Sequence, residues 1–275
     1  MKKEKESIGL RFLYHTILGR CFLKVLSCRF ISKVVGLFLS TFPSRILIKR
    51  FIRKNNIPME EYKEEKYPNF NAFFDREVKE EYRPMAKKEA DLISPCDGFL
   101  SVYPIEDGLV LPIKQSSYSI ASLLQNEELA KKYQDGICMV LRLCVNHYHR
   151  YCYLDEGTKE KNVSIPGVLH TVRPIALESI PVFIENAREY TILHTKHFGD
   201  VVQIEVGALF VGKIKNHHEE YSFCRGEEKG MFLFGGSTII LLFQKNAAYI
   251  PKGFFEKTEK GYEIPVKMGE KIGNK

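Results

Sequence analysis

The segment Phe232-Leu233-Phe234-Gly235-Gly236-Ser237-Thr238-Ile239-Ile240-Leu241-Leu242-Phe243 is an apolar run that two glycines and two hydroxyl residues interrupt. Its arms are rich in β-branched and aromatic residues, which predicts buried strands. The glycine pair indicates a bulge, a tight bend or a close backbone approach, because a residue without Cβ can adopt positive φ. The Ser237 hydroxyl then lies beside the Gly236 carbonyl, which suits intramolecular attack on that peptide bond. The alternative is a structural β-bulge that contains a small polar residue.

Apolar runs separated by turn signals continue this pattern through the second half of the chain. Residues 137–143 predict a buried strand, and further strand candidates cover residues 163–168, 181–184, 190–193 and 201–214. Residues 116–134 predict a helical interlude with Ser119 as its cap, and residues 246–275 predict a looser polar tail. The expected fold class is α+β, with a predominantly antiparallel β body and a basic helical N-terminal region.

Positive charge is concentrated at the start of the chain. Residues 1–54 hold 13 of the 41 Lys and Arg residues but only 2 of the 34 Asp and Glu residues, and the whole chain has a net charge of +7. Such local basicity indicates an anionic partner surface, either nucleic acid or phospholipid headgroups. The longest uncharged run in this region, residues 34–44, has 11 residues, whereas a membrane-spanning helix needs about 20.

A basic amphipathic helix is predicted from Ser44, a candidate N-cap. Arg45, Lys49 and Arg53 recur there at helical spacing among apolar residues, which suits the membrane interface. The alternative is a helical layer packed on the protein's own core, with its charges solvated. We expect a domain boundary near residue 65, with a basic helical region over 1–65 and a β-rich domain over 66–275.

Cysteine and histidine usage limits the chemistry that the chain is expected to perform. The seven cysteines are odd in number and form no Cys-x-x-Cys pair, so neither a disulfide framework nor a zinc cluster is expected, and a reducing cytoplasm is the default. His147 and His149 could share one face of an extended chain, but local spacing supplies no third ligand, so no metal is expected. No phosphate-binding loop or dinucleotide fingerprint occurs in the sequence.

Three separated groups can form a Ser/His/Asp relay if the fold unites them. Asp97 lies in an Asp-Gly turn signal, His149 follows the strand predicted over 137–143, and Ser237 follows the glycine pair. Sequence alone does not show that these three residues meet.

The motifs around these residues resemble a known family. Ser94-Pro95-Cys96-Asp97-Gly98, Tyr148-His149-Arg150 and Gly235-Gly236-Ser237-Thr238 together are similar to the signature set of phosphatidylserine decarboxylases. Further similar segments follow in the same order: Phe70–Arg76, Arg83-Pro84, Thr171–Pro174, Asn186–Glu189, Val206–Ala208 and Val211–Ile214. The resemblance covers roughly residues 65–245, and the basic N-terminal region resembles the membrane-associating segment of that family.

The resemblance implies a proenzyme that cuts itself between Gly236 and Ser237. Residues 1–236 would become a large chain and residues 237–275 a small one, with Ser237 converted into a covalent pyruvoyl group. His149 would take the Ser237 proton, and Asp97 would fix the orientation of the imidazole. No metal or nucleotide is implied.

The activity implied by the resemblance is conversion of phosphatidylserine to phosphatidylethanolamine and CO₂. A Schiff base between the substrate amine and the pyruvoyl ketone would accept the electrons left by CO₂, and His149 would protonate the carbanion. The implied partners are phosphatidylserine, an anionic membrane surface, the two chains of the same proenzyme and a second copy in a homodimer, with no nucleic acid. The expected location is peripheral, at the cytoplasmic face of the cell membrane.

One departure from the family pattern bears on these roles. Many members carry a second His three residues after the first, where this chain has Cys152. Either His149 serves both steps, or Cys152, His147 or His170 substitutes. Gly235 also replaces a position that is commonly Leu. The alternative function is a non-catalytic membrane-binding scaffold of the same fold, which Cys152 favours; a nucleic-acid-binding domain ranks last because no readout motif occurs.

Overall fold

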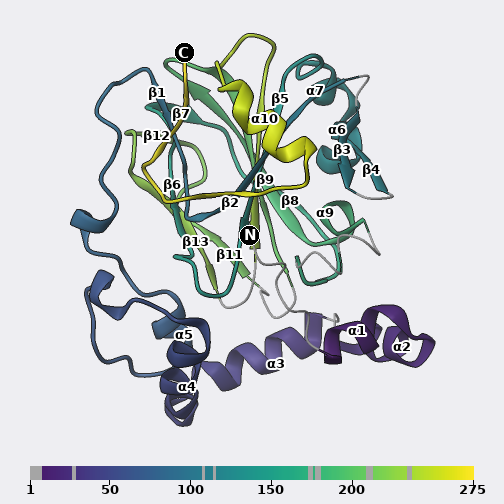
Figure 1. The fold of residues 1–275 in the computed structure, drawn as a ribbon, viewed down its shortest axis with the longest axis vertical. Helices are drawn as coiled ribbons and strands as arrows, with labels where there is room; N and C mark the ends of the chain where they lie inside the picture. The colour runs from purple at the N-terminus through teal and green to yellow at the C-terminus, as the bar shows by residue number, and fades with distance from the viewer. Residues whose placement is uncertain are drawn as a thin grey trace.

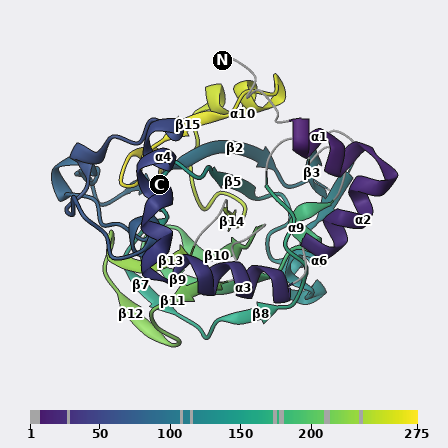
Figure 2. The same ribbon diagram turned by 90° about the horizontal axis from the view of Figure 1, so that it is seen from below.

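A β body with a helical layer beneath it forms the molecule (Figure 1). The computed structural model describes residues 8–26, 29–106, 109–113, 116–172, 176, 181–208, 213–233 and 237–275. The helical layer consists of residues 8–26 and 29–55. Viewed from below, it lies across one face of the β body (Figure 2).

The helices are short. They are α1 Ile8–His15, α2 Ile17–Leu26, α3 Arg29–Leu39, α4 Ile46–Asn55, α5 Phe70–Phe74, α6 Ile120–Leu124, α7 Glu127–Lys131, α9 Val182–Glu185 and α10 Lys252–Glu259, with 3-10 helices η1 Phe42–Arg45, η2 Met59–Glu61 and η3 Glu80–Tyr82. No helix among the described residues has the length and apolar character needed to cross a bilayer.

Sixteen strands are described. They are β1 Asp91–Ile93, β2 Gly98–Pro104, β3 Leu109–Ile113, β4 Ser116–Ser119, β5 Ile137–Leu143, β6 Arg150–Cys152, β7 Gly157–Lys159, β8 Val163–Ile165, β9 Arg188–Thr195, β10 Gly199–Val206, β11 Lys213–Asn216, β12 Tyr221–Phe223, β13 Glu228–Leu233, β14 Ser237–Phe243, β15 Ile264–Val266 and β16 Lys271–Asn274.

The main sheet is antiparallel and has β14 near its middle. Its strand order is β12-β7-β9-β10-β14-β5-β2-β15, with β8 paired to β9. A second sheet, β11-β13-β6, and the pairs β1-β16 and β3-β4 complete the strands. Every residue of β14 is buried, because β10 and β5 pair with its two edges and the body covers both its faces. The α+β class with an antiparallel β body is confirmed.

Two hydrophobic clusters stabilise the molecule. The larger one fills the β body. The second, here called the helical cluster, joins α3, α4 and α5 to the chain that precedes β6, and consists of Leu39, Ile48, Ile57, Tyr62, Tyr67, Phe70, Phe73, Phe74, Val78 and Tyr148. This cluster includes residues on both sides of position 65, and the domain boundary placed there stays a prediction.

Ser44 has a different role from the predicted one. The cap of α4 is Arg45, and no side-chain cap bond forms there, because the chain is already in the 3-10 helix η1 at residue 44. The Ser44 hydroxyl is buried, donates toward the Leu39 and Thr41 carbonyls and accepts a 2.9 Å hydrogen bond from the Phe70 amide. The prediction of a Ser44 cap is therefore wrong, and Ser44 instead joins η1 to α5.

Two further expectations are corrected, and one is confirmed. Residues 182–185 form one helical turn that follows Pro181, where a strand was expected. The C-terminal tail is ordered: β15 pairs with β2, and β16 pairs with β1. Ser119 does cap a helix, because its side chain accepts a hydrogen bond from the Ser122 amide at the start of α6.

Candidate active site

Ser237 begins β14 and lies inside the β body. It pairs with Leu143 at the end of β5, and its side chain is fully buried. Gly235 and Gly236 lie outside the described residues, so the predicted cleavage junction is described on its Ser237 side only. The strong strand preference of residues 238–243 and their pairing with both neighbours hold Ser237 in a fixed place.

His149 faces Ser237. Its Nδ1 is 3.4 Å from Ser237 Oγ, and its Nε2 is 3.0 Å from the Cys144 carbonyl oxygen. Because a carbonyl oxygen only accepts hydrogen bonds, Nε2 must carry the ring proton in the neutral imidazole. Nδ1 is then the free base that faces the hydroxyl. The 3.4 Å separation is typical of a catalytic contact that tightens when the reaction begins.

Burial keeps the His149 imidazole neutral. It lowers the pKa of His149 well below its usual value, and the charges of Arg76 and His147 lower it further, against an opposing effect of the Cys144 carbonyl. Burial also lowers the pKa of His147 to about 4. At neutral pH the unprotonated form that a general base requires is therefore present.

Asp97 is held by a different set of partners. Its carboxylate accepts from Arg83 Nε at 2.7 Å, from Arg83 Nη2 at 2.6 Å and from the Met268 amide at 2.9 Å. Arg83 also pairs with Glu61 at 2.8 Å. In the described part of the chain no hydrogen bond joins Asp97 to His149, whose Nε2 faces Cys144 instead. The structure thus brings Ser237 and His149 together, while the predicted role of Asp97 toward His149 stays a prediction.

Asp97 nevertheless influences the second histidine. Its negative charge raises the pKa of His147, partly offsetting the effect of burial. The His147 Nδ1 accepts a 3.1 Å hydrogen bond from the Cys144 amide, and its ring lies 5.1 Å from that of Phe99. His147 therefore interacts electrostatically with both Asp97 and His149.

The other candidate substitutes differ in their surroundings. Cys152 in β6 is buried beside the Pro95 carbonyl, and burial raises the pKa of its thiol to about 12, so it stays protonated. His170 pairs with Glu185 at 3.4 Å, and burial lowers its pKa. Among the described residues, neither Cys152 nor His170 forms a hydrogen bond with Ser237 or His149.

Sequence reasoning missed several residues that shape this site. The Phe74 ring stacks on His149 with 4.2 Å between centroids, and Arg83 binds Asp97. Both lie in segments that resemble the family, but nothing in the sequence assigned either residue to the site. The Cys144 carbonyl is a backbone group, and no sequence signal identifies it.

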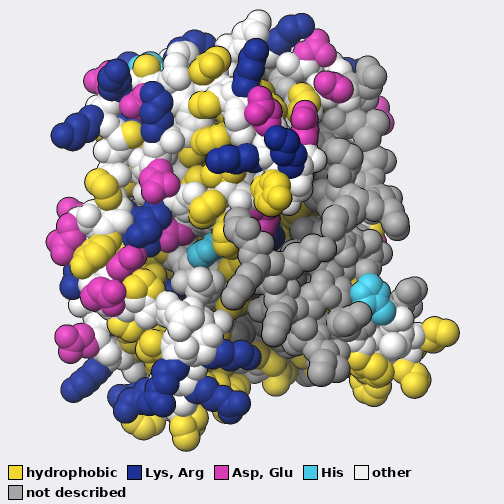
Figure 3. Space-filling view, viewed as in Figure 1, with side chains coloured by type: hydrophobic (Ala, Val, Ile, Leu, Met, Phe, Trp, Pro, Cys, Tyr) yellow, Lys and Arg dark blue, Asp and Glu magenta, His cyan; other side chains and the backbone are white. Residues whose placement is uncertain are grey.

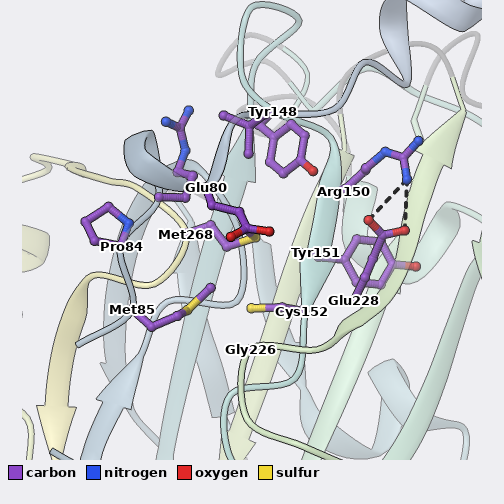
Figure 4. Close-up of a pocket in the computed structure, with 12 residues that line it drawn as sticks. Glu80, Pro84, Met85, Tyr148, Arg150, Tyr151, Cys152, Gly226, Glu228 and Met268 are labelled. Carbon is purple, nitrogen blue, oxygen red and sulfur yellow. Dashed lines mark hydrogen bonds and ion pairs between the residues drawn. The ribbon is translucent and has the colours of Figure 1, made fainter. Parts of the chain in front are cut away.

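A cavity of about 460 Å³ lies beside the site (Figure 4). Tyr148, Arg150 and Cys152 line it from β6 and the residues before it, and Glu228 pairs there with Arg150 at 3.1 Å. Neither His149 nor Ser237 belongs to its lining. In the described part of the chain, no group of three or more His, Cys, Asp or Glu residues is placed to hold a metal.

Comparisons with known proteins agree with this site. Residues 70–274 match the family model described as phosphatidylserine decarboxylase. Phosphatidylserine decarboxylase proenzyme 2 of Clostridium acetobutylicum is 45% identical over 273 residues, which cover 99% of this chain and 94% of the relative. The phosphatidylserine decarboxylase proenzymes of Clostridium novyi and Clostridium botulinum (strain 657) are 42% and 39% identical, each over 97% of this chain and 92% of the relative. The resemblance seen in the sequence is thereby confirmed, and the chain belongs to the phosphatidylserine decarboxylase family.

Proposed function

We propose that this phosphatidylserine decarboxylase is made as a proenzyme that cuts itself between Gly236 and Ser237 and converts Ser237 into its pyruvoyl group. The observation that carries the proposal is the 3.4 Å contact between Ser237 Oγ and the free Nδ1 of a neutral, buried His149. The relatives' names, which call them proenzymes, support self-processing as well.

In the proposed first step, His149 Nδ1 takes the hydroxyl proton of Ser237. The serine oxygen attacks the carbonyl carbon of residue 236, the C–N bond breaks as His149 passes the proton to the Ser237 nitrogen, and an ester replaces the peptide bond. Removal of the Ser237 α-proton then breaks the ester bond and frees the carboxylate end of residues 1–236. Hydrolysis of the remaining unsaturated residue releases ammonia and leaves the pyruvoyl group on residues 237–275.

The residues at the site fit such a group. Its precursor Ser237 is fully buried and is fixed by β5 and β10, so water is largely excluded from the reacting centre. A pyruvoyl group supplies an electron-accepting carbonyl to the substrate amine. We propose that His149 then donates the proton that replaces CO₂, and that the negative charge of Asp97 favours the protonated imidazole.

We also propose a peripheral location on an anionic membrane at its cytoplasmic face. Large apolar side chains are exposed on the helical layer, including Ile17 at 84%, Ile46 at 83% and Phe42 at 69%. Hydrophobic and basic side chains gather at this end of the molecule (Figure 3). The described cysteines are all free thiols, which suits a reducing compartment. Homodimer formation stays a prediction.

Intact-mass measurement of purified wild type and Ser237→Ala tests the proposal. The wild type should give a small chain of about 4 kDa, estimated from its length, whereas Ser237→Ala should remain a single 31.8 kDa chain that forms no phosphatidylethanolamine. Ser101→Ala, a buried serine on β2, is the matched control and should be cut normally. Wild type that stays at full mass and turns over no lipid would favour the scaffold alternative.

A further inference from the structure

Helix α5 connects the helical layer to the imidazole of His149. On one side, the Phe70 amide donates to Ser44 Oγ, and Asn71 Nδ2 donates to the Gly36 carbonyl at 3.1 Å and to Ser40 Oγ at 2.7 Å. These bonds tie α5 to the end of α3 and to η1. On its other side, α5 ends at Phe74, which contacts His149.

Phe74 covers one face of the His149 ring. The two rings are stacked, with centroids 4.2 Å apart and planes inclined by 30°. Phe74 and His149 are each only 1% exposed. The aromatic face therefore excludes water from the imidazole and limits its rotation about χ2, which leaves Nδ1 directed at Ser237.

Arg76 fixes the backbone that carries His149. Its Nη2 donates to the Asn146 carbonyl at 3.3 Å and to the His147 carbonyl at 3.2 Å, and its Nη1 reaches the carbonyls of Phe73 and Phe74. The guanidinium is 2% exposed and lies over the Tyr62 ring, 4.3 Å from its centroid. One buried cation thus joins the end of α5 to the loop directly before His149.

The same helical layer carries the exposed apolar side chains. Those of Val34, Leu37 and Phe38 belong to α3, and those of Phe42, Ile46 and Leu47 belong to η1 and α4. Packing within the helical cluster joins α3 and α4 to α5. A displacement of α3 or α4 is therefore transmitted to Phe74 and Arg76 through contacts of buried groups.

We propose that Phe74 and Arg76 are positioning residues for His149, which make the placement of its imidazole depend on the docking of α3, α4 and α5 on the β body. This inference rests on the proposed role of His149 as the base for self-cleavage. It assigns a function to two buried residues that act through His149.

The test follows self-cleavage of full-length chains made by cell-free translation and shifted to buffers between pH 5 and pH 9. The variants are Phe74→Leu and Arg76→Lys. Phe198→Leu is the matched control, since Phe198 is a fully buried phenylalanine of the β body, outside the helical cluster, and its ring lies against His197 and Phe243. Melting temperatures measured in the Ser237→Ala background report the loss of stability separately.

Phe74→Leu should slow cleavage roughly tenfold or more, because misplacing a reacting group by about 1 Å costs up to about 100-fold. It should also move the acid limb of the pH profile to higher pH, since water that reaches the ring restores the pKa of His149 toward its usual value. Arg76→Lys should slow cleavage through the loosened loop, and Phe198→Leu should leave the acid limb unmoved.

Equal rates and pH profiles for Phe74→Leu, Arg76→Lys and Phe198→Leu would overturn the inference. The proposed function would survive that result, provided that wild type is cut and Ser237→Ala is not. Cleavage of Ser237→Ala would instead remove the basis of both proposals.

Discussion

Asp75, which directly follows Phe74, has a carboxyl group that the fold keeps protonated to a higher pH than usual. Burial raises its pKa from 3.8 to about 7, against the opposing charges of Arg150, Lys215 and Arg76. Its Oδ1 has no hydrogen-bond partner among the described residues. A carboxyl whose pKa is higher in the folded state binds its proton more tightly there than in the unfolded chain. The free energy of unfolding therefore falls as the pH rises from about 4 to about 7.

Asp75→Asn should remove this pH-dependent loss. From pH 5 to pH 8 the free energy of unfolding of wild type should fall by on the order of 2 kcal/mol more than that of Asp75→Asn, because one pKa unit corresponds to about 1.4 kcal/mol. Urea unfolding at both pH values measures the difference, with the Ser237→Ala background keeping the chain uncut. Asp135→Asn, which alters an exposed ion pair with Lys245, should change stability little at either pH. A stability difference for Asp75→Asn that is the same at both pH values would contradict the expectation.

Residues near the site also mark what the sequence could indicate and what it could not. The family resemblance of their motifs implied that Ser237 and His149 act together, and the two side chains do lie in contact. The partner of His149 Nε2 could not be predicted, since the Cys144 carbonyl is a backbone group whose direction depends on the turn around it. The pairing of Asp97 with Arg83 depends on a contact between separate loops, which no local pattern encodes.

Strand β13 joins the smaller sheet to the main sheet through a buried charge. Lys229 Nζ lies 2.7 Å from Glu205 Oε1 on β10 and 2.8 Å from Asn216 Oδ1 on β11, and Lys229 and Glu205 are both fully buried. Gln203 also donates to Glu205, at 2.9 Å. A buried ion has lost its hydration. The charge of Lys229 or of Glu205 is therefore tolerated in the interior only while the opposite charge compensates it.

Lys229→Met should therefore destabilise the chain by about 3 to 5 kcal/mol, since it leaves the Glu205 carboxylate buried without its cation. The double variant Lys229→Met/Glu205→Gln should recover much of this loss, because no uncompensated charge remains. Guanidinium unfolding in the Ser237→Ala background measures both free energies. Finding the double variant less stable than Lys229→Met would show that the pair is not coupled in this way.

Among the elements, apolar strands could be predicted better than polar ones. Strands β5 and β14 are continuous apolar runs, which is the pattern of a strand covered on both faces. Strands β15 and β16 lie in a polar tail and are strands because β2 and β1 offer them backbone partners. The turn at residues 182–185 was misjudged because a four-residue apolar run fits a strand and a helical turn equally well.

At the scale of the whole molecule, the proposed small chain is built into the fold. Its strand β14 lies between β5 and β10, and α10 packs on β2 in the view of Figure 1. Arg142 pairs with Glu263, and Lys267 pairs with Glu61. A cut before Ser237 therefore leaves an assembled body, because these contacts do not depend on the peptide bond at residue 236.

The helical layer presents exposed apolar side chains at the lower end of the molecule in the view of Figure 3. Phe42→Glu and Ile46→Glu should each weaken binding to phosphatidylserine-containing vesicles by roughly tenfold or more, since burial of one large apolar side chain contributes about 1.5 to 3 kcal/mol. Vesicle flotation measures this, and mass spectrometry should show that self-cleavage is unaffected, because Ser237 lies inside the β body. Val163→Glu is the matched control, as Val163 is a 43% exposed apolar residue on β8. If Val163→Glu weakened binding as much as Ile46→Glu, the contact with lipid would have to involve the β body, and the helical layer would lose its proposed role as the membrane surface.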